Sequence, residues 1–202
     1  MRGAPILVAA HGAGGHKDDA SMLRLGRALE RAGIEVVRFN FPYREKGSRR
    51  IDPTPLLRQC FSSQVENLRG KNNARKILIG GRSMGGRVAS MMAAEGFACD
   101  GLILAAYPLH PAGEPAKLRA AHLPSIRQPV LCLNGTRDAL CRRDLMEGVL
   151  ARLAPAWRMH WLEAADHSFR VLKRSGRTEA DVDAEVTAAA RAWLESVGAR
   201  GV

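Results

Sequence analysis

The sequence predicts an α/β fold, built on a doubly wound, mostly parallel sheet of about six strands with helices on both faces. Short apolar runs without polar interruption are typical of strands buried on both faces of a parallel sheet. Segments with apolar residues at helical spacing separate most successive runs, so strands and helices alternate along the chain. The predicted strands are 6–10, 36–41, 76–80, 102–106, 130–133 and 157–161.

Helical patterns fill the intervals between these runs, except for a proline-bearing segment at 107–129. Thr54 followed by Pro55 marks a helix start, and Thr178 with Asp181 resembles a capping box before the last helix. In 157–161 large apolar residues alternate with Arg and His, which predicts a strand at the edge of the sheet. The clearest helical stripe, with the glycine expected to close it, is Met22, Leu25, Leu29, Ala32 and Gly33.

Length and composition favour one domain over residues 1–202. The chain has 202 residues and 46% hydrophobic content, enough for one sizeable core and short for two. No apolar stretch approaches the roughly 18 residues needed to cross a bilayer, so we expect neither export nor a membrane partner. The four cysteines are scattered, without a CxxC pair or zinc spacing. We therefore expect a cytoplasmic protein with no metal and no cofactor.

The charge is strongly basic, with 31 Lys and Arg against 20 Asp and Glu and a formal net charge of +11. Clustered cations bind polyanions, but only residues 44–50 form a basic cluster, and this cluster lacks the interleaved aromatic residues that stack on bases. Nucleic acid is therefore a disfavoured partner, whereas an anionic small substrate stays open. The sequence carries no signal for oligomeric state.

The most informative stretch is the pentapeptide 81–85, Gly-Arg-Ser-Met-Gly, between a predicted strand and a predicted helix. A serine on such a turn adopts a strained backbone, and glycines two residues away on each side remove Cβ atoms that would collide with neighbouring elements. Such a pentapeptide also arises by chance in glycine-rich chains, so its placement carries the prediction. Ser83 is the candidate nucleophile.

A serine nucleophile needs a base that can reach its hydroxyl group from the carboxyl edge of the sheet. His167 lies between the last predicted strand and the last helix, which is where this architecture offers a base. His160 falls within the edge strand, where a solvated surface residue is the favoured interpretation. His110 and His122 lie in the segment after Tyr107, and each is a less favoured candidate that could line a pocket.

The third member should be a carboxylate that accepts the other imidazole N–H and fixes the tautomer. Asp138 follows strand 130–133 through a turn rich in glycine and polar residues, at the same sheet edge. Asp166 is the rival, but a residue adjacent to the histidine seldom folds back onto its ring. Asp144 fits a helix start better. The resulting order of nucleophile, acid and base belongs to one particular hydrolase architecture.

A tetrahedral oxyanion needs two backbone N–H donors. Met84 supplies one from the start of a helix, where the helix dipole also favours negative charge. Ala13 is the expected second donor, in the glycine-rich turn 11–15 after the first strand. This turn also suggests a phosphate cradle, but it lacks both the Gly-x-Gly-x-x-Gly spacing and the Lys-Ser/Thr ending.

With these residues in place, the chain resembles the α/β-hydrolase superfamily over essentially its whole length. Within that superfamily it looks like the small dienelactone-hydrolase-like proteins and relatives that include scaffold components of chromatin-associated complexes. The resemblance implies a Ser-Asp-His triad at Ser83, Asp138 and His167, with oxyanion donors at Ala13 and Met84. The segments that carry it are 11–15, 41–44, 81–87, 107–111 and 166–168.

The chain also departs from its relatives. Dienelactone hydrolases use a cysteine nucleophile where this chain has Ser83. The segment 108–128 stands where many relatives insert a large lid, and it is too short for an independent cap. We therefore expect an open, shallow site for a small acyl substrate. Candidate residues for the rim of that site are His11, Gly12, Tyr43, Arg82 and His110.

Two functions follow. The leading one is a serine hydrolase that cleaves an ester, thioester or similar acyl bond. The alternative is a catalytically silent interaction module. All three triad residue types are present in the expected order, and a scaffold that had lost catalysis would usually have lost at least one of them.

Overall fold

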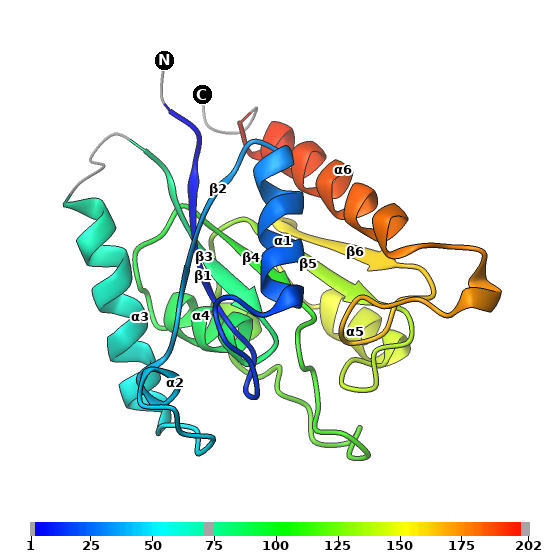
Figure 1. Cartoon of the computed structure of the whole chain (residues 1–202), viewed down its shortest axis with the longest axis horizontal. Helices are drawn as coiled ribbons and strands as arrows, with labels where there is room; N and C mark the ends of the chain where they lie inside the picture. The colour runs from blue at the N-terminus through cyan, green and yellow to red at the C-terminus, as the bar shows by residue number, and fades with distance from the viewer. Residues whose placement is uncertain (1–2, 71–74, 199–202) are drawn as a thin grey trace.

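A computed structural model describes residues 3–70 and 75–198 and confirms the predicted fold class (Figure 1). Every strand pair in the sheet is parallel, and the strand order is β2-β1-β3-β4-β5-β6. The six strands of the described residues are β1 (Ile6–Ala10), β2 (Glu35–Phe39), β3 (Ile77–Arg82), β4 (Gly101–Ala105), β5 (Val130–Gly135) and β6 (Trp157–Leu162).

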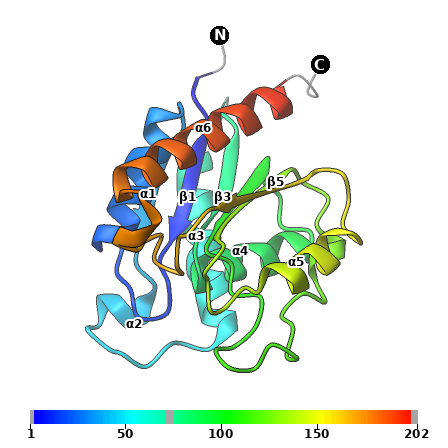
Figure 2. The ribbon, with the colours of Figure 1, turned by 90° about the vertical axis from the view of Figure 1, so that its right-hand side faces the viewer.

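Helices cover both faces of this sheet (Figures 1 and 2). One apolar core contains Leu7 and Ala9 with residues of α1 and α6, and the other contains Ile6 and Val8 with residues of α3, α4 and α5. Alternate residues of β1 thus enter opposite cores, as the unbroken apolar run predicts. The helices are α1 (Ala20–Arg31), α2 (Pro42–Glu45), α3 (Thr54–Arg69), α4 (Met84–Ala94), α5 (Arg143–Leu150) and α6 (Glu179–Gly198), with the short 3-10 turns η1 (Leu123–Ser125) and η2 (Lys173–Ser175).

The register of the strands brings their carboxyl ends to one edge. Ala10, the last residue of β1, pairs with Gly81 of β3, and Gly135 of β5 pairs with Leu162 of β6. The chain runs from β1 outward to β2, and then returns to β3 on the other side of β1. This reversal makes the boundary of β1 and β3 the switch point where ligands bind in doubly wound folds.

Most strand bounds differ from the sequence prediction by one or two residues, and two differences lie at helix starts. Strand β2 ends at Phe39 and not at residue 41, because Pro42 occupies the first position of α2 and Phe41 is its N-cap. Thr54 is already helical in α3, and the N-cap is Pro53. The capping box is confirmed: Asp181 Oδ2 accepts the Thr178 N–H at 2.7 Å, and Thr178 Oγ1 accepts the Asp181 N–H at 3.2 Å.

The segment between β4 and β5 has η1 as its only helical turn and forms no separate cap. Within the segment the Tyr107 hydroxyl donates to the carbonyl of Arg119 at 2.7 Å, and the His110 N–H ties the segment to the rest of the chain by donating to the carbonyl of Leu140 at 3.0 Å. Leu123 and Ile126 anchor it in the core. Among the described residues, no helix has both the length and the apolar character needed to span a bilayer.

Candidate active site

Ser83 lies on a strained turn between β3 and α4, with φ 48° and ψ −114°. A positive φ is costly for a residue with a Cβ atom, so the surroundings must impose it. Cβ atoms added at Gly81 and Gly85 would lie 2.0 and 2.3 Å from the carbonyl oxygen of Ala10. Glycine on both sides of Ser83 therefore lets the turn pack closely against the end of β1. The Ser83 N–H donates to the carbonyl of Ala105 at 2.9 Å, which fixes the backbone of the turn.

The imidazole ring of His167 lies between a hydroxyl group and a carboxylate. Its Nε2 is 3.0 Å from Ser83 Oγ, and its Nδ1 is 2.9 and 2.8 Å from the two carboxylate oxygens of Asp138. The Asp138 side chain is fully buried, whereas that of His167 is 28% exposed. The structure thus brings together three side chains that are remote in sequence, in the arrangement a serine nucleophile needs.

Two donors besides the His167 ring hold the Asp138 carboxylate. The Leu140 N–H donates to Oδ1 at 2.8 Å, and the Asn134 amide donates to Oδ2 at 3.1 Å. Because both oxygens already accept these bonds, the carboxylate has one fixed orientation toward the His167 ring. The rival Asp166 instead accepts the backbone N–H groups of Ser168 and Arg170 at 2.8 and 3.0 Å, so it shapes the loop that carries the histidine.

The other candidate histidines have partners elsewhere. His160 Nε2 lies 2.8 Å from a carboxylate oxygen of Glu185, and His110 is buried with Nε2 accepting the Arg142 N–H at 3.2 Å. Neither ring is therefore placed to act as the base of a serine nucleophile.

A second serine–histidine contact joins Ser90 of α4 to His122, whose Nε2 is 2.8 Å from the hydroxyl oxygen. Ser90 is 0% exposed, and its hydroxyl already donates to the carbonyl of Arg87 at 2.8 Å. Burial lowers the pKa of His122 to about 4, with a smaller contribution from the nearby Arg87 guanidinium. A buried hydroxyl beside so weak a base is a structural contact, and this pair has no access to substrate.

Arg82 joins the nucleophile turn to the histidine loop. Its backbone precedes Ser83, while its guanidinium donates to the carbonyl of His167 and lies 5.4 Å from the ring centroid of Phe169. The residue is only 7% exposed. Burial lowers the pKa of the guanidinium, and the carboxylates of Asp138 and Asp166 oppose that shift. Arginine stays protonated in proteins, so Arg82 is a buried cation that ties the histidine loop to β3.

His11 orients the peptide that carries one predicted oxyanion donor. Its Nδ1 is 2.7 Å from the carbonyl oxygen of Gly12, and its Nε2 accepts the Phe41 N–H at 3.2 Å. These contacts fit the neutral ring with its proton on Nδ1, and burial lowers the pKa of His11, which favours that form. In a trans peptide the C=O and N–H groups point in opposite directions, so the Ala13 N–H points away from the His11 ring.

Two further groups secure this loop. The Tyr43 hydroxyl donates to the carbonyl of Ala13 at 2.6 Å, and the Asn40 side chain accepts the Lys17 N–H at 2.7 Å. The Met84 N–H opens α4 directly after the nucleophile and has no backbone acceptor in the described part of the chain. The first N–H groups of a helix lack intrahelical partners and are free for a ligand.

An open cleft of about 410 Å³ lies in front of Ser83. Of the predicted rim residues, Gly12 and Arg82 line this cleft. His11, Tyr43 and His110 do not, because each is buried and uses its polar atoms to fix backbone groups. Sequence reasoning missed Asp19, Ser21 and Leu140, which lie on loops or at a helix start and also line the cleft. Nothing in their local sequence marks them.

The parallel sheet and the hydrogen-bonded serine on its strand-to-helix turn define a fold of the α/β serine hydrolase type. A family model described as an alpha/beta hydrolase domain matches residues 3–195. That span covers nearly the whole sequence, and the chain belongs to this family.

Solved structures share the fold at low sequence identity. An α/β serine hydrolase homologue from Coxiella burnetii is 18% identical with a TM-score of 0.74, over 93% of this chain and 86% of that one. A serine hydrolase without a lid from Xanthomonas campestris is 20% identical with a TM-score of 0.70, over 95% and 83% of the two chains. A dienelactone hydrolase from Anabaena variabilis is 20% identical with a TM-score of 0.70, over 96% and 87%. Likeness at this identity concerns the fold.

Proposed function

We propose that this protein is a serine hydrolase that cleaves an ester, thioester or related acyl bond of a small substrate. The observation that carries this proposal is the His167 ring, which contacts both Ser83 Oγ and the Asp138 carboxylate. The likeness in fold to serine hydrolases and a dienelactone hydrolase supports the same class of chemistry.

In the proposed reaction Ser83 Oγ attacks the substrate carbonyl while His167 Nε2 takes the hydroxyl proton. Asp138 holds the ring and stabilises the imidazolium that forms. The N–H groups of Ala13 and Met84 bind the oxyanion. His167 then gives its proton to the leaving group, and the acyl-serine remains. Water, deprotonated by the same histidine, releases the acid and restores the serine.

The cleft suggests a small substrate with polar groups. Ser21, Asp19 and Arg82 contribute to its lining, with Leu140 and Met22 as apolar contacts. No residue of the segment 107–129 lines it, so an uncovered site serves the reaction. The four cysteines are free thiols, and we propose a reducing cytoplasmic setting for this activity.

Hydrolysis of p-nitrophenyl acetate, together with labelling by a fluorophosphonate, tests the proposal. The unmodified protein should turn over the ester, and the adduct should map to Ser83. Ser21 lines the same cleft but has no hydrogen bond to a histidine among the described residues, so it should stay unlabelled. The Ser83→Ala variant should lose turnover and labelling while keeping its circular dichroism spectrum. A folded wild-type protein whose serine stays inert would favour the alternative, a catalytically silent interaction module.

A further inference from the structure

The glycine-rich turn after β1 carries one of the two predicted oxyanion donors, the N–H group of Ala13. The Gly15 N–H donates to the carbonyl of Gly12 at 2.9 Å, so the chain between them forms a β-turn with Ala13 and Gly14 at its centre. We call it the oxyanion turn. Its four residues all line the cleft in front of Ser83. The conformation of this turn therefore decides which backbone groups a substrate in the cleft meets.

The peptide that joins Ala13 to Gly14 is the central peptide of the oxyanion turn. Type I and type II turns differ by a reversal of that peptide, which exchanges the directions of its C=O and N–H groups. Type II needs a positive φ at the second central residue, and glycine adopts a positive φ about as readily as a negative one. Among the described residues, Gly14 is not one of the glycines with positive φ, so the turn has the type I form. Nothing in the sequence of the turn itself excludes the reversed form.

Tyr43 holds the central peptide in its observed orientation. Its hydroxyl donates to the carbonyl of Ala13 at 2.6 Å, across thirty residues of sequence. Tyr43 is 1% exposed, and burial raises the pKa of its hydroxyl, so the group stays protonated and can donate. In the type II form the Ala13 carbonyl would point away from Tyr43, and the buried hydroxyl would lose its acceptor. The hydrogen bond thus favours the type I form.

The surrounding structure fixes Tyr43 in turn. Its backbone N–H donates to Asp52 Oδ2 at 2.8 Å, and its backbone carbonyl accepts the Ser48 N–H at 2.8 Å. Its ring lies edge-on to the His11 ring, with a centroid distance of 5.8 Å. Because backbone and ring are both held, the hydroxyl approaches the oxyanion turn from one direction and cannot follow a reversed carbonyl.

The orientation of the central peptide decides whether the cleft receives a hydrogen-bond donor or an acceptor. The C=O and N–H groups of a trans peptide point in opposite directions, so the Gly14 N–H points away from Tyr43. Gly14 lines the cleft and Tyr43 does not, so this direction leads out of the core. The Gly14 N–H has no acceptor in the described part of the chain, and a ligand can use it.

We propose that Tyr43 is a positioning residue for the oxyanion site, because it holds the oxyanion turn in the form that presents N–H groups to the cleft. Reversal of the central peptide would replace the Gly14 N–H by the Ala13 carbonyl oxygen, whose partial negative charge would repel the oxyanion. The Tyr43 hydroxyl touches no reacting atom and acts through the backbone. This inference rests on the proposed serine hydrolase function and adds a residue to it.

Tyr43→Phe removes the hydroxyl and keeps the buried ring. Tyr107→Phe is the matched control, because Tyr107 is the other tyrosine of the chain, is 0% exposed, and donates its hydroxyl to the carbonyl of Arg119 at 2.7 Å. With p-nitrophenyl acetate, the kcat of Tyr43→Phe should fall by about 10–100-fold while KM stays within about twofold, since the lost contact acts in the transition state. The kcat of Tyr107→Phe should stay within about twofold, because Tyr107 does not line the cleft.

Benzyl trifluoromethyl ketone reports on the oxyanion directly, because its adduct with a serine carries the same negatively charged oxygen as the tetrahedral intermediate. The inhibition constant of this ketone for Tyr43→Phe should rise by the factor by which kcat/KM falls. For Tyr107→Phe it should stay within about twofold of the value for the unmodified protein. A loss of stability alone would not link the two quantities.

The Gly14→Ala background tests the oxyanion turn itself. A Cβ atom at Gly14 would meet no atom within 4 Å, and alanine disfavours the positive φ that the reversed form needs. In this background the Tyr43→Phe change should cost about tenfold less in kcat than it costs in the chain with Gly14, because alanine itself then opposes the reversal.

An unmodified protein that neither hydrolyses the ester nor reacts with the fluorophosphonate would overturn the proposed function and this inference with it. With an active unmodified protein, the inference alone is overturned by an unchanged kcat in Tyr43→Phe or by equal losses in the two tyrosine variants. An unchanged inhibition constant for the ketone despite a lower kcat, or an equal cost of Tyr43→Phe in both backgrounds, would also overturn it.

Discussion

Replacement of Asp138 by asparagine should nearly abolish hydrolysis. The two carboxylate oxygens accept from the Leu140 N–H at 2.8 Å, from the Asn134 amide at 3.1 Å and from His167 Nδ1. An asparagine side chain turns one of these oxygens into an NH₂ group, so in either orientation a donor faces a donor. With the NH₂ group toward His167, the ring must carry its proton on Nε2. It then cannot accept the proton of Ser83.

The expected loss in kcat is about 10,000-fold, or about 5.5 kcal/mol of transition-state stabilisation. One buried donor without an acceptor should also lower the free energy of unfolding by about 1–3 kcal/mol. Steady-state hydrolysis of p-nitrophenyl acetate measures the first effect, and urea denaturation measures the second.

Asp166→Asn is the matched control for this experiment. Asp166 uses its Oδ1 atom to accept the N–H groups of Ser168 and Arg170, and an asparagine carbonyl can accept the same bonds. The kcat of the Asp166→Asn variant should stay within about threefold of that of the unmodified protein, because most surface substitutions have effects no larger than this. Retention of more than a tenth of the activity by Asp138→Asn, or an equal loss in the control, would refute the assigned role of Asp138.

Three more predictions concern the scaffold. Arg82→Lys removes the guanidinium that holds the carbonyl of His167, so kcat should fall by about 10–100-fold with a smaller change in KM; equal kcat values would contradict this. Gly85→Ala places a Cβ atom 2.3 Å from a carbonyl oxygen of β1 and should lower the midpoint of thermal unfolding sharply. Gly148→Ala is its control, because a Cβ atom there would meet no atom within 4 Å. This change should raise the free energy of unfolding by about 1 kcal/mol, since alanine favours a helix more than glycine does. Burial holds the folded-state pKa of His122 at about 4, below its ordinary 6.5, so its contribution to stability is present above about pH 6.5 and is lost as the pH falls toward 4. Urea denaturation at pH 6.5 and pH 4 measures the free energy of unfolding that the protein loses over this interval. In the His122→Gln variant this loss should be smaller by about 1–2 kcal/mol, after allowance for solvent screening. An equal loss in the variant and the unmodified protein would show that His122 does not cause it.

Local patterns made the fold and the position of the serine predictable. Buried parallel strands are continuous apolar runs, so periodicity alone separated them from the amphipathic helices. The turn at Ser83 depends on glycines two residues away, and it is therefore readable within a single short segment. Asp138 and His167 follow the last two strands, and parallel strands send their carboxyl ends to one edge. Their proximity could be inferred, and their catalytic roles stay a prediction.

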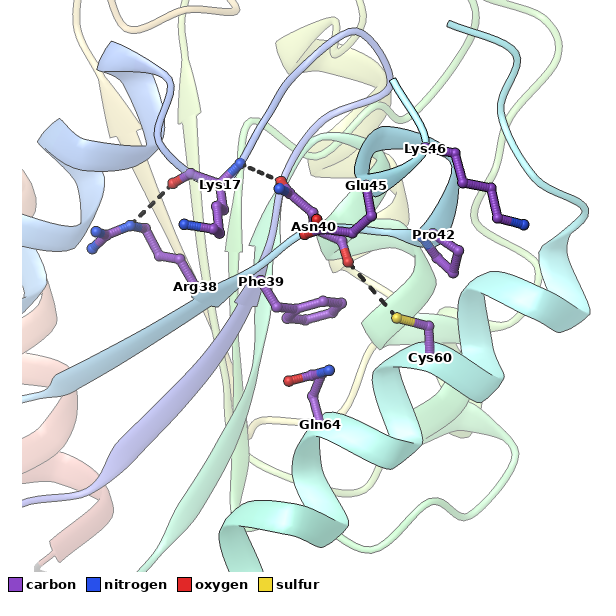
Figure 3. A pocket seen from close by; sticks show the side chains of 9 residues that line it. All are labelled: Lys17, Arg38, Phe39, Asn40, Pro42, Glu45, Lys46, Cys60 and Gln64. Carbon is purple, nitrogen blue, oxygen red and sulfur yellow. Dashed lines mark hydrogen bonds between the residues drawn. The ribbon is translucent and has the colours of Figure 1, made fainter. Parts of the chain in front are cut away.

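The supporting contacts were not readable in the same way. His11 and Tyr43 follow strands and carry polar groups, which favoured a position on the rim. In the structure both side chains point inward, because they bond to Phe41 and Ala13. These partners lie thirty residues away in sequence, so no local pattern indicates the contacts. A strand ending tells which edge a residue occupies, but the direction of its side chain depends on the elements that pack over it. The hollow beside Phe39, Asn40 and Cys60 also escaped prediction, since residues of three separate segments line it (Figure 3).

The uncovered cleft has a consequence for the second half of the proposed catalytic cycle. Enzymes with a closing cover often wait for it to open before product leaves, and they keep bulk solvent from the reactive intermediate. Here the segment 107–129 is tied down by its own hydrogen bonds and stands clear of the cleft. In the proposed reaction, solvent at full concentration would meet the acyl-serine as soon as it forms. We therefore expect hydrolysis to prevail over transfer of the acyl group to a scarce alcohol or amine.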